Sequence, residues 1–409
     1  MQKTKCLLLI FDGMGDRPVA ELGGLTPLEA AETPNLDAMA KRGINGIMDP
    51  IAPGIRPGSD TSHLSYLGAD PYVWYTGRGP FEAAGIGLDV RPGDVAFRCN
   101  FATVDEKMAI VDRRAGRITE GTHELAQAID GMEIQGVKVI FKESVAHRGA
   151  LILRGSGLGH KVSDVDPHDT GGPVRRCEAL DADSRKTASV INEFVRISHE
   201  RLEKHRVNVE RRKKGLLPAN ALLPRGAGVL KEIPSFKQRF GLSAAAIAEV
   251  GLISGVAKIV GLDVIEVAGS TGGLDTDTKA LGSAAVSALG RYDFVMMNVK
   301  GCDIAGHDGQ PKAKVAMIER LDQMIGEIMP LIGEGTYVAV TADHSTPVSV
   351  KNHSGDPVPL CIVGRGVRPD DVTEFGERSC SKGGMGRITG KDLMNVLLDL
   401  MDRAPMFGA

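Results

Sequence analysis

The stretch Gly-Cys-Asp-Ile-Ala-Gly-His occupies residues 301–307 and follows an apolar run, residues 292–299 (YDFVMMNV). Such a run is typical of a buried strand, so we expect a glycine-flanked loop to present Asp303 and His307 at the strand's end. Open α/β sheets place their ligand sites at the carboxyl ends of the strands. The stretch therefore predicts an α/β fold with a functional site at one edge of its sheet.

The same arrangement recurs after two other predicted strands. One apolar run (TYVAVTA) ends in Asp343 and His344, an N-terminal run (CLLLIF) ends in Asp12, and His353 follows further along the chain. A lone Asp after a strand is usually a helix cap or a turn residue. Three Asp and three His around strand ends are harder to explain in this way, and together they suffice for two divalent ions.

Residues 57–68 (PGSDTSHLSYLG) predict a helix that begins near Ser59 or Asp60. Taken alone, Ser59 is a good N-cap residue. A helix N-terminus also favours an anion, and a serine hydroxyl beside divalent ions can lose its proton and attack phosphorus. His63 lies one helical turn further on the same face. The pattern leaves both roles of Ser59 open.

Residues 93–209 differ in character from the chain on either side. Their short predicted strands and one long helix over residues 184–205 suit a compact inserted α+β domain. Cationic turns in this segment lie beside acidic and imidazole side chains: Asp112, Arg113, Arg114, Arg117, His147 and Arg148. A charge run is usually a solvated face, whereas arginine forks also bind anions, and both interpretations carry even weight. We expect Arg113 to be exposed, with little influence on folding.

The remaining sequence is consistent with an α/β enzyme. Strands alternate with helices, which predicts a sandwich with a mostly parallel sheet; we expect a helix over residues 243–260 and an irregular connection over residues 206–228. The net charge of −3 gives no indication of a nucleic-acid or membrane partner. Six cysteines without a CxxC pair, two of them (Cys6 and Cys361) in apolar runs, argue against disulfides. We therefore expect a cytoplasmic protein.

Several motifs together resemble the alkaline phosphatase superfamily and, within it, the archaeal-type, 2,3-bisphosphoglycerate-independent phosphoglycerate mutases. They include FDGMGDRP, PGSDTSHLSYLGADP, VKGCDIAGHDG, TADHSTP and HSGDPVPL, and similar motifs cover nearly the whole chain. The resemblance implies an alkaline-phosphatase-like three-layer sandwich over residues 1–92 and 210–409, with a substrate-binding lid domain inserted at residues 93–209. It also implies interconversion of 3- and 2-phosphoglycerate, a step of glycolysis and gluconeogenesis, through a phosphoserine at Ser59.

The resemblance further implies which residues bind metal and substrate. One ion is held by Asp303, His307 and His353, and the other by Asp12, Ser59, Asp343 and His344. Mixed carboxylate and imidazole ligands favour Mn²⁺, with Zn²⁺, Mg²⁺ and Co²⁺ as alternatives. The candidate substrate contacts are Lys279, Arg225, Asp112, Arg113, His147 and Arg148. Arg225, which precedes a glycine, equally suits a hinge.

Two other functions remain open at this point. Another phosphotransferase of the same superfamily (a phosphatase, a phosphopentomutase or a homoserine kinase) would use the same ions and Ser59 with a different pocket. A metal-stabilised binding protein without turnover is the second alternative, although a structural site has no use for a nucleophile such as Ser59. We expect phosphoglycerate as the small-molecule partner, no nucleic acid and no membrane, and we leave homo-oligomerisation open.

Overall fold

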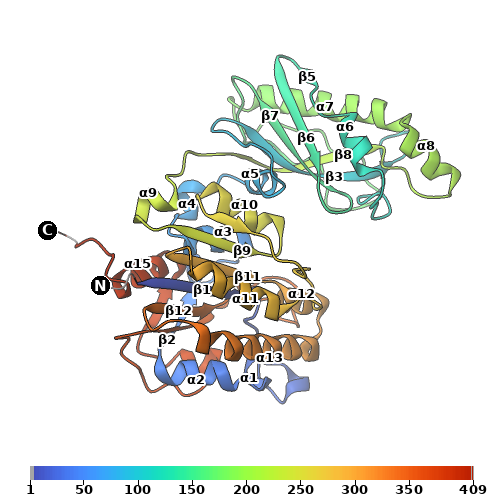
Figure 1. The fold of residues 1–409 in the computed structure, drawn as a ribbon. Helices are drawn as coiled ribbons and strands as arrows, with labels where there is room; N and C mark the ends of the chain where they lie inside the picture. The colour runs from blue at the N-terminus through green and yellow to red at the C-terminus, as the bar shows by residue number, and fades with distance from the viewer. Residues whose placement is uncertain (1–3, 407, 409) are drawn as a thin grey trace. The chain divides into compact units, whose positions relative to one another are not determined.

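The computed structural model describes residues 4–406 and 408, and the chain separates into two compact units. The first unit comprises the chain up to Val73 and from Ile233 onward, and the second comprises Trp74–Glu232 (Figure 1). The second unit extends beyond the expected insertion, residues 93–209, at both ends. It does so because a helix over residues 79–85 packs against its sheet and a strand over residues 221–229 is part of that sheet.

The first unit is built on an eight-stranded sheet with the order β10-β9-β11-β1-β12-β13-β2-β14. Its strands are β1 (Lys5–Phe11), β2 (Ile44–Asp49), β9 (Ala244–Ala248), β10 (Asp263–Ile265), β11 (Phe294–Val299), β12 (Thr336–Thr341), β13 (Val358–Val363) and β14 (Gly386–Thr389). Among these described strands β13 alone runs against its neighbours, so the predicted mostly parallel α/β sheet is confirmed.

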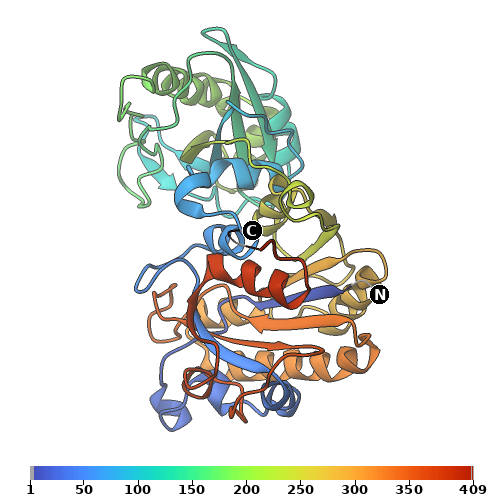
Figure 2. The same ribbon diagram turned by 90° about the vertical axis from the view of Figure 1, so that its left-hand side faces the viewer.

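Helices cover both faces of this sheet, which explains why its central strands are mostly apolar. One face carries α3 (Ser59–Tyr66), α10 (Gly251–Ile259) and α15 (Gly390–Leu400), and the other carries α2 (Pro34–Arg42), α11 (Thr278–Leu289) and α13 (Pro311–Ile328), as Figures 1 and 2 show. Shorter helices are α1 (Pro27–Ala30), α4 (Pro71–Trp74), α9 (Phe236–Phe240), α12 (Gly301–Asp308) and α14 (Glu377–Cys380). None of the described helices is long and apolar enough to cross a membrane.

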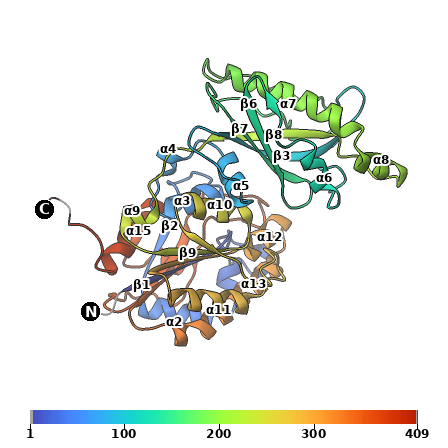
Figure 3. The ribbon, with the colours of Figure 1, turned by 45° about the horizontal axis from the view of Figure 1, so that its top comes forward.

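The second unit contains a separate, antiparallel sheet with the order β4-β3-β7-β6-β5, and β8 pairs with β3 as well. The strands are β3 (Val95–Val104), β4 (Ile110–Asp112), β5 (Glu133–Ile134), β6 (Val137–Glu143), β7 (Arg148–Arg154) and β8 (Ala221–Val229). Side chains of β3 alternate between two cores. Phe97 and Phe101 belong to the core on one face, and Ala96 belongs to a smaller core on the other. The helices of this unit are α5 (Gly79–Gly85), α6 (Thr122–Gln127) and α7 (Arg185–Glu203), and Figure 3 shows α7 running along the sheet.

Two expectations about local structure are wrong. The predicted helix over residues 243–260 is β9 followed by α10, because an alanine-rich run is compatible with either conformation until its neighbours are known. The predicted connection over residues 206–228 contains α8 (Arg206–Lys213) and most of β8. Pro224 argues against a strand in sequence, but β8 pairs with β3 alone among the described strands, and an edge position tolerates proline.

The centre of the larger sheet should be sensitive to a loss of packing. Leu8 of β1 is fully buried between β11 and β12, so we expect Leu8→Ala to lower the free energy of unfolding by about 2–5 kcal/mol. Urea unfolding followed by circular dichroism measures this change. Leu331→Ala is the matched control, since Leu331 is 67% exposed and should change stability little. Equal effects of the two substitutions would contradict the assigned core.

Candidate functional site

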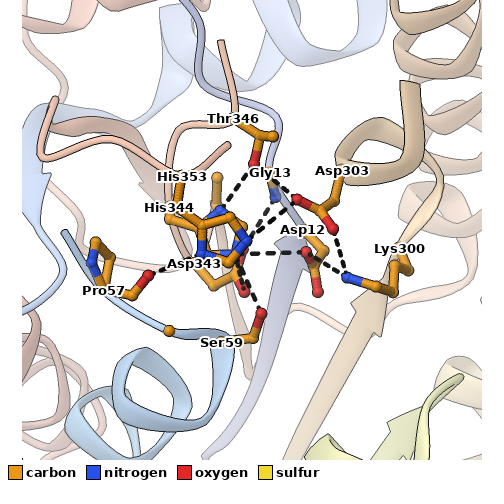
Figure 4. Close-up of polar contacts among 12 residues, drawn as sticks. Asp12, Gly13, Pro57, Ser59, Lys300, Asp303, Asp343, His344, Thr346 and His353 are labelled. Carbon is orange, nitrogen blue, oxygen red and sulfur yellow. Dashed lines mark hydrogen bonds and ion pairs between the residues drawn. The ribbon is translucent and has the colours of Figure 1, made fainter. Parts of the chain in front are cut away.

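The predicted metal ligands meet at the carboxyl ends of three neighbouring strands, β11, β1 and β12 (Figure 4). Asp12 follows β1, and Asp343 follows β12. Asp303 and His307 lie beyond β11, on α12 rather than on the loop expected from sequence. Four residues apart on a helix, they share one face, and His307 Nε2 is 3.3 Å from Asp303 Oδ1.

The ligand atoms form two groups that share His344. One group is Asp303, His344 and His353, the other is Asp12, Asp343 and His344, and within each group the ligand atoms lie within 4.8 Å of one another. His344 Nε2 is 3.2 Å from Asp343 Oδ2 and 3.7 Å from Asp12 Oδ1. His353 Nε2 is 3.6 Å from Asp303 Oδ1. The geometry therefore places His344 between two candidate metal sites. The sequence analysis had assigned His344 to one ligand set only, the set with Asp12, Ser59 and Asp343.

The histidines of this site are held in the tautomer that binds metal. His307 Nδ1 donates to the carbonyl of Lys351 (3.0 Å), and His353 Nδ1 donates to the carbonyl of Pro57 (2.8 Å). A carbonyl can only accept, so Nδ1 carries the proton and Nε2 keeps a lone pair directed at the carboxylates. Fixing the outer ring nitrogen in this way is how proteins orient imidazole ligands.

Thr346 fixes the third histidine by the same logic. Its hydroxyl donates to Asp303 Oδ1 (2.7 Å) and so accepts a hydrogen bond from His344 Nδ1 (3.0 Å). His344 Nε2 is therefore left free to bind a cation. Burial and the adjacent His353 lower the pKa of His344 to about 3, so the imidazole is neutral at pH 7.

An unpaired buried oxygen supports a cation at this site. Asp343 Oδ1 accepts from the Gly13 amide (3.0 Å), whereas the buried Oδ2 has no hydrogen-bond donor among the described residues. Leaving such an oxygen unsatisfied is unfavourable, and a metal ion would satisfy it. Gly13 is required here, because its φ is +66° and a Cβ would lie 2.7 Å from Asp303 Cα. The donors present thus fit divalent ions.

Ser59 presents its side chain to the cluster from the start of α3 (Figure 4). Gly58 occupies the N-cap position, so the interpretation of Ser59 as a capping residue is wrong. Instead Ser59 Oγ lies 3.1 Å from His344 Nε2. His63 Nδ1 donates to the Ser59 carbonyl (2.7 Å), and the Tyr66 hydroxyl at the other end of α3 donates to the backbone just after β12 (2.8 Å). Ser59 and Tyr66 therefore connect the two ends of α3 to the segment that follows β12.

Two further residues of the site were missed in sequence. Lys300, the residue directly after β11, places Nζ 2.6 Å from Asp303 Oδ2 and 3.3 Å from Asp12 Oδ1. Asn298, within β11, donates from Nδ2 to Asp12 Oδ2 and to His63 Nε2, each at 3.2 Å. A polar residue inside an otherwise apolar strand and a lysine three residues before Asp303 are the sequence signals that could have identified them.

The charges of the cluster perturb one another. Burial and the nearby Asp343 raise the pKa of Asp12. Burial would also raise the pKa of Asp303, but the Lys300 ammonium, which also donates a hydrogen bond to this carboxylate, outweighs burial and holds that pKa well below its usual range. Burial disfavours the charged form of Lys300, yet Asp12 and Asp303 raise its pKa above the usual value. The ammonium is thus the positive partner of two acidic groups.

A second, cationic cluster lies in the second unit. Its pocket of about 440 Å³ is lined by Arg98, Asn100, Arg113, Arg114, Arg117, Ala146, His147, Arg148, His168 and Arg225. Four candidate substrate contacts are therefore brought together there. Burial lowers the pKa of Arg98 to about 10, and burial together with Arg148 and Arg114 lowers the pKa of His147 to about 4. The pocket combines several cations with a neutral imidazole.

Arg113 is not the exposed residue expected from sequence. Its guanidinium forms a two-pronged ion pair with fully buried Asp166, with Nε and Nη2 at 2.8 and 2.7 Å from the two carboxylate oxygens. Nη1 donates to the carbonyl of His168 (3.1 Å). Arg225 Nε approaches the same carboxylate at 3.6 Å. Arg113 therefore helps to hold the wall of the pocket.

Two candidate substrate residues do not line this pocket. Lys279 lies on α11, where its side chain is 77% exposed and forms an ion pair with Glu327 at 3.6 Å. Asp112, the last residue of β4, accepts a hydrogen bond from the Arg114 amide at 2.6 Å and shapes the turn that follows. The structure assigns both side chains contacts within the protein.

Comparisons with known proteins cover the whole chain. A family model described as the metalloenzyme superfamily matches residues 4–400. A 2,3-bisphosphoglycerate-independent phosphoglycerate mutase from Methanothermobacter thermautotrophicus is 56% identical over 99% of this chain and 100% of its own. A solved protein from Pyrococcus horikoshii is 44% identical with a TM-score of 0.88, and both chains are fully covered. A cofactor-independent phosphoglycerate mutase from Thermoplasma acidophilum is 39% identical with a TM-score of 0.75, covering 97% of this chain and 100% of that one.

The candidate metal sites predict how ions stabilise the protein. After dialysis against a chelator, added Mn²⁺ should raise the Tm, because an ion that binds only the folded state stabilises it. Titration calorimetry should show two ions per chain in the wild type. In His353→Ala, which removes a ligand from one group, one ion should bind more weakly than the other. His123→Ala is the control, since His123 is a surface residue of the second unit paired with Glu143. An unchanged titration in His353→Ala would contradict the assignment.

The Arg113–Asp166 ion pair predicts a loss of stability. Arg113→Ala leaves Asp166 buried with fewer donors, so we expect the free energy of unfolding to fall by about 1–3 kcal/mol. Urea unfolding measures the change. The control is Arg114→Ala, which removes an exposed arginine from the same pocket and should alter stability little. Wild-type stability in Arg113→Ala would restore the interpretation of Arg113 as a free surface cation.

Proposed function

The chain belongs to the archaeal-type 2,3-bisphosphoglycerate-independent phosphoglycerate mutases of the metalloenzyme superfamily, and we propose that it interconverts 3-phosphoglycerate and 2-phosphoglycerate through a phosphoserine at Ser59. The observation that carries this proposal is the position of Ser59 Oγ, 3.1 Å from His344 Nε2 at the junction of the two ligand groups. A serine hydroxyl in such surroundings is placed to be a nucleophile.

The ligand groups fit two divalent ions, and Mn²⁺ suits their mixed carboxylate and imidazole donors best. Asp303, His307 and His353 would hold one ion; Asp12, Ser59, Asp343 and His344 would hold the other. When bound, the ions supply positive charge that favours loss of the serine proton and neutralises the phosphoryl oxygens. The positive end of the α3 dipole adds to this field at Ser59.

The reaction consists of two displacements at phosphorus. In the first, Ser59 Oγ forms a bond to the phosphorus of 3-phosphoglycerate, the bond to the substrate's 3-oxygen breaks, and that oxygen takes up a proton. In the second, the 2-hydroxyl of the same glycerate loses a proton and attacks the phosphoserine, which releases Ser59. Phosphoryl transfer of this kind depends mainly on positioning and on balanced charge. Water must be excluded, because hydrolysis of the phosphoserine would make the enzyme a phosphatase.

The cationic pocket of the second unit suits an anionic group of the substrate. Arginine forks match a planar carboxylate, so we assign to this pocket the binding of the glycerate carboxylate, with Arg98, Arg148 and Arg225 as its contacts. His147 is neutral at pH 7, and its buried Nδ1 has no hydrogen-bond partner among the described residues. An imidazole in that state can accept a proton from a glycerate hydroxyl and return it.

Substitution of Ser59 tests the covalent route. Ser59→Ala should lower interconversion of 3- and 2-phosphoglycerate by several orders of magnitude, because no hydroxyl remains to carry the phosphoryl group. The fold should survive, since Ser59 does not cap α3. Incubation of the wild type with 3-phosphoglycerate, followed by acid quenching and peptide mass spectrometry, should detect phosphate on Ser59 and none in the variant.

The same helix offers a matched control. Ser62 is fully buried three residues further along α3, and its hydroxyl has no hydrogen-bond partner among the described residues, so Ser62→Ala should retain activity. Wild-type mutase activity in Ser59→Ala would show that the nucleophile lies elsewhere. Release of only inorganic phosphate by the wild type would replace the mutase with a phosphatase that uses the same site.

A further inference from the structure

Lys300 occupies a position that the proposed reaction does not explain. It is the N-cap residue of α12, and its mostly buried side chain reaches one carboxylate from each ligand group, Asp303 and Asp12 (Figure 4). Its backbone is held independently of any ion, because the Lys300 amide donates to Glu249 Oε2 at 2.7 Å. The other oxygen of Glu249 accepts hydrogen bonds from Thr276 and Gly272 of a neighbouring loop.

The two oxygens of Asp303 face different partners. Oδ2 accepts from Lys300 Nζ (2.6 Å), whereas Oδ1 faces His307 Nε2 (3.3 Å) and His353 Nε2 (3.6 Å). Thr346 donates to Oδ1 as well (2.7 Å). The ammonium thus orients the carboxylate so that Oδ1 remains available at the histidines. At Asp12 the ammonium and a cation would compete, because Oδ1 lies between Lys300 Nζ (3.3 Å) and His344 Nε2 (3.7 Å).

The charges of the site explain why a fixed cation is useful there. Asp12, Asp303 and Asp343 are all buried, so the loss of hydration and their mutual repulsion act on each of them. Buried carboxylates without counter-charge repel one another and lose hydration, which favours their separation or partial unfolding of the site. Lys300 lies against two of the three and reduces this repulsion before a metal ion arrives.

We propose that Lys300 is a built-in cation that holds Asp12 and Asp303 in their metal-binding positions and competes with the entering metal ions for the same two carboxylates. Lys300 is therefore a positioning residue for both ligand groups. The proposal rests on metal binding at these groups, but it does not depend on which substrate the enzyme converts. Its test accordingly measures metal affinity and stability without an activity assay.

The test is Lys300→Met, which keeps an unbranched side chain and removes the charge. In titration calorimetry after chelator treatment, the variant should bind Mn²⁺ at least about tenfold more tightly than the wild type, because a like charge next to the ions has been removed. The Tm of the metal-free variant should fall, since its carboxylates have lost their counter-charge. The Tm difference between metal-loaded and metal-free protein should therefore widen.

Two controls make the outcome decisive. Lys279→Met removes an exposed lysine of the same unit and should change neither the Mn²⁺ affinity nor the Tm of the metal-free protein. Lys300→Gln keeps a hydrogen-bond donor without the charge and should also bind Mn²⁺ more tightly, which covers the case in which the metal-free Met variant does not fold. Unchanged or weaker Mn²⁺ binding in the Lys300 variants would overturn the proposal. A wild type that binds no Mn²⁺ would instead overturn the metal sites themselves.

Discussion

Three carboxylates that repel one another are buried at the ends of adjacent strands, and the organisation of the first unit follows from balancing that charge. Asp12, Asp303 and Asp343 each show at most 1% exposure. Desolvating such groups is unfavourable by several kcal/mol apiece unless donors or cations compensate. Parallel neighbours β11, β1 and β12 bring the carboxylates together, and the protein meets each with a donor: an amide, a hydroxyl or the Lys300 ammonium. Divalent ions at the two candidate metal sites would complete the balance.

A second buried lysine supports the same loops from behind. Lys314 of α13 is fully buried, and its ammonium donates to Asp16 (2.7 Å) and to the carbonyls of Gly15 and Thr346 (3.0 Å each). It thereby joins the loop after β1 to the loop after β12. Because Thr346 in turn orients Asp303 and His344, the long helix α13 helps to determine ligand geometry without touching a ligand.

The site was largely predictable from sequence wherever an apolar run leads directly into a polar residue. Asp12 and Asp343 are of this kind, because burial of a strand determines where its end must lie. Contacts made by packing were not predictable. Lys300 faces the carboxylates only because α12 begins at the next residue, and Arg113 is tied down by Asp166, which is distant in sequence. The alanine-rich β9 shows the same limit for the fold, since its pairing with β10 and β11 decides between strand and helix.

The interruption of the first unit by the second affects how the chain is made on the ribosome. β1 lies at the centre of the larger sheet, yet it pairs with β11 and β12, which begin at Phe294 and Thr336. Synthesis proceeds at about 5–20 residues per second, so roughly 15–60 seconds pass between the synthesis of β1 and that of β11, the first of these partners. The second unit is continuous in sequence and can fold during that interval. During synthesis the chain can therefore hold a folded second unit while β1 still lacks its neighbouring strands in the sheet.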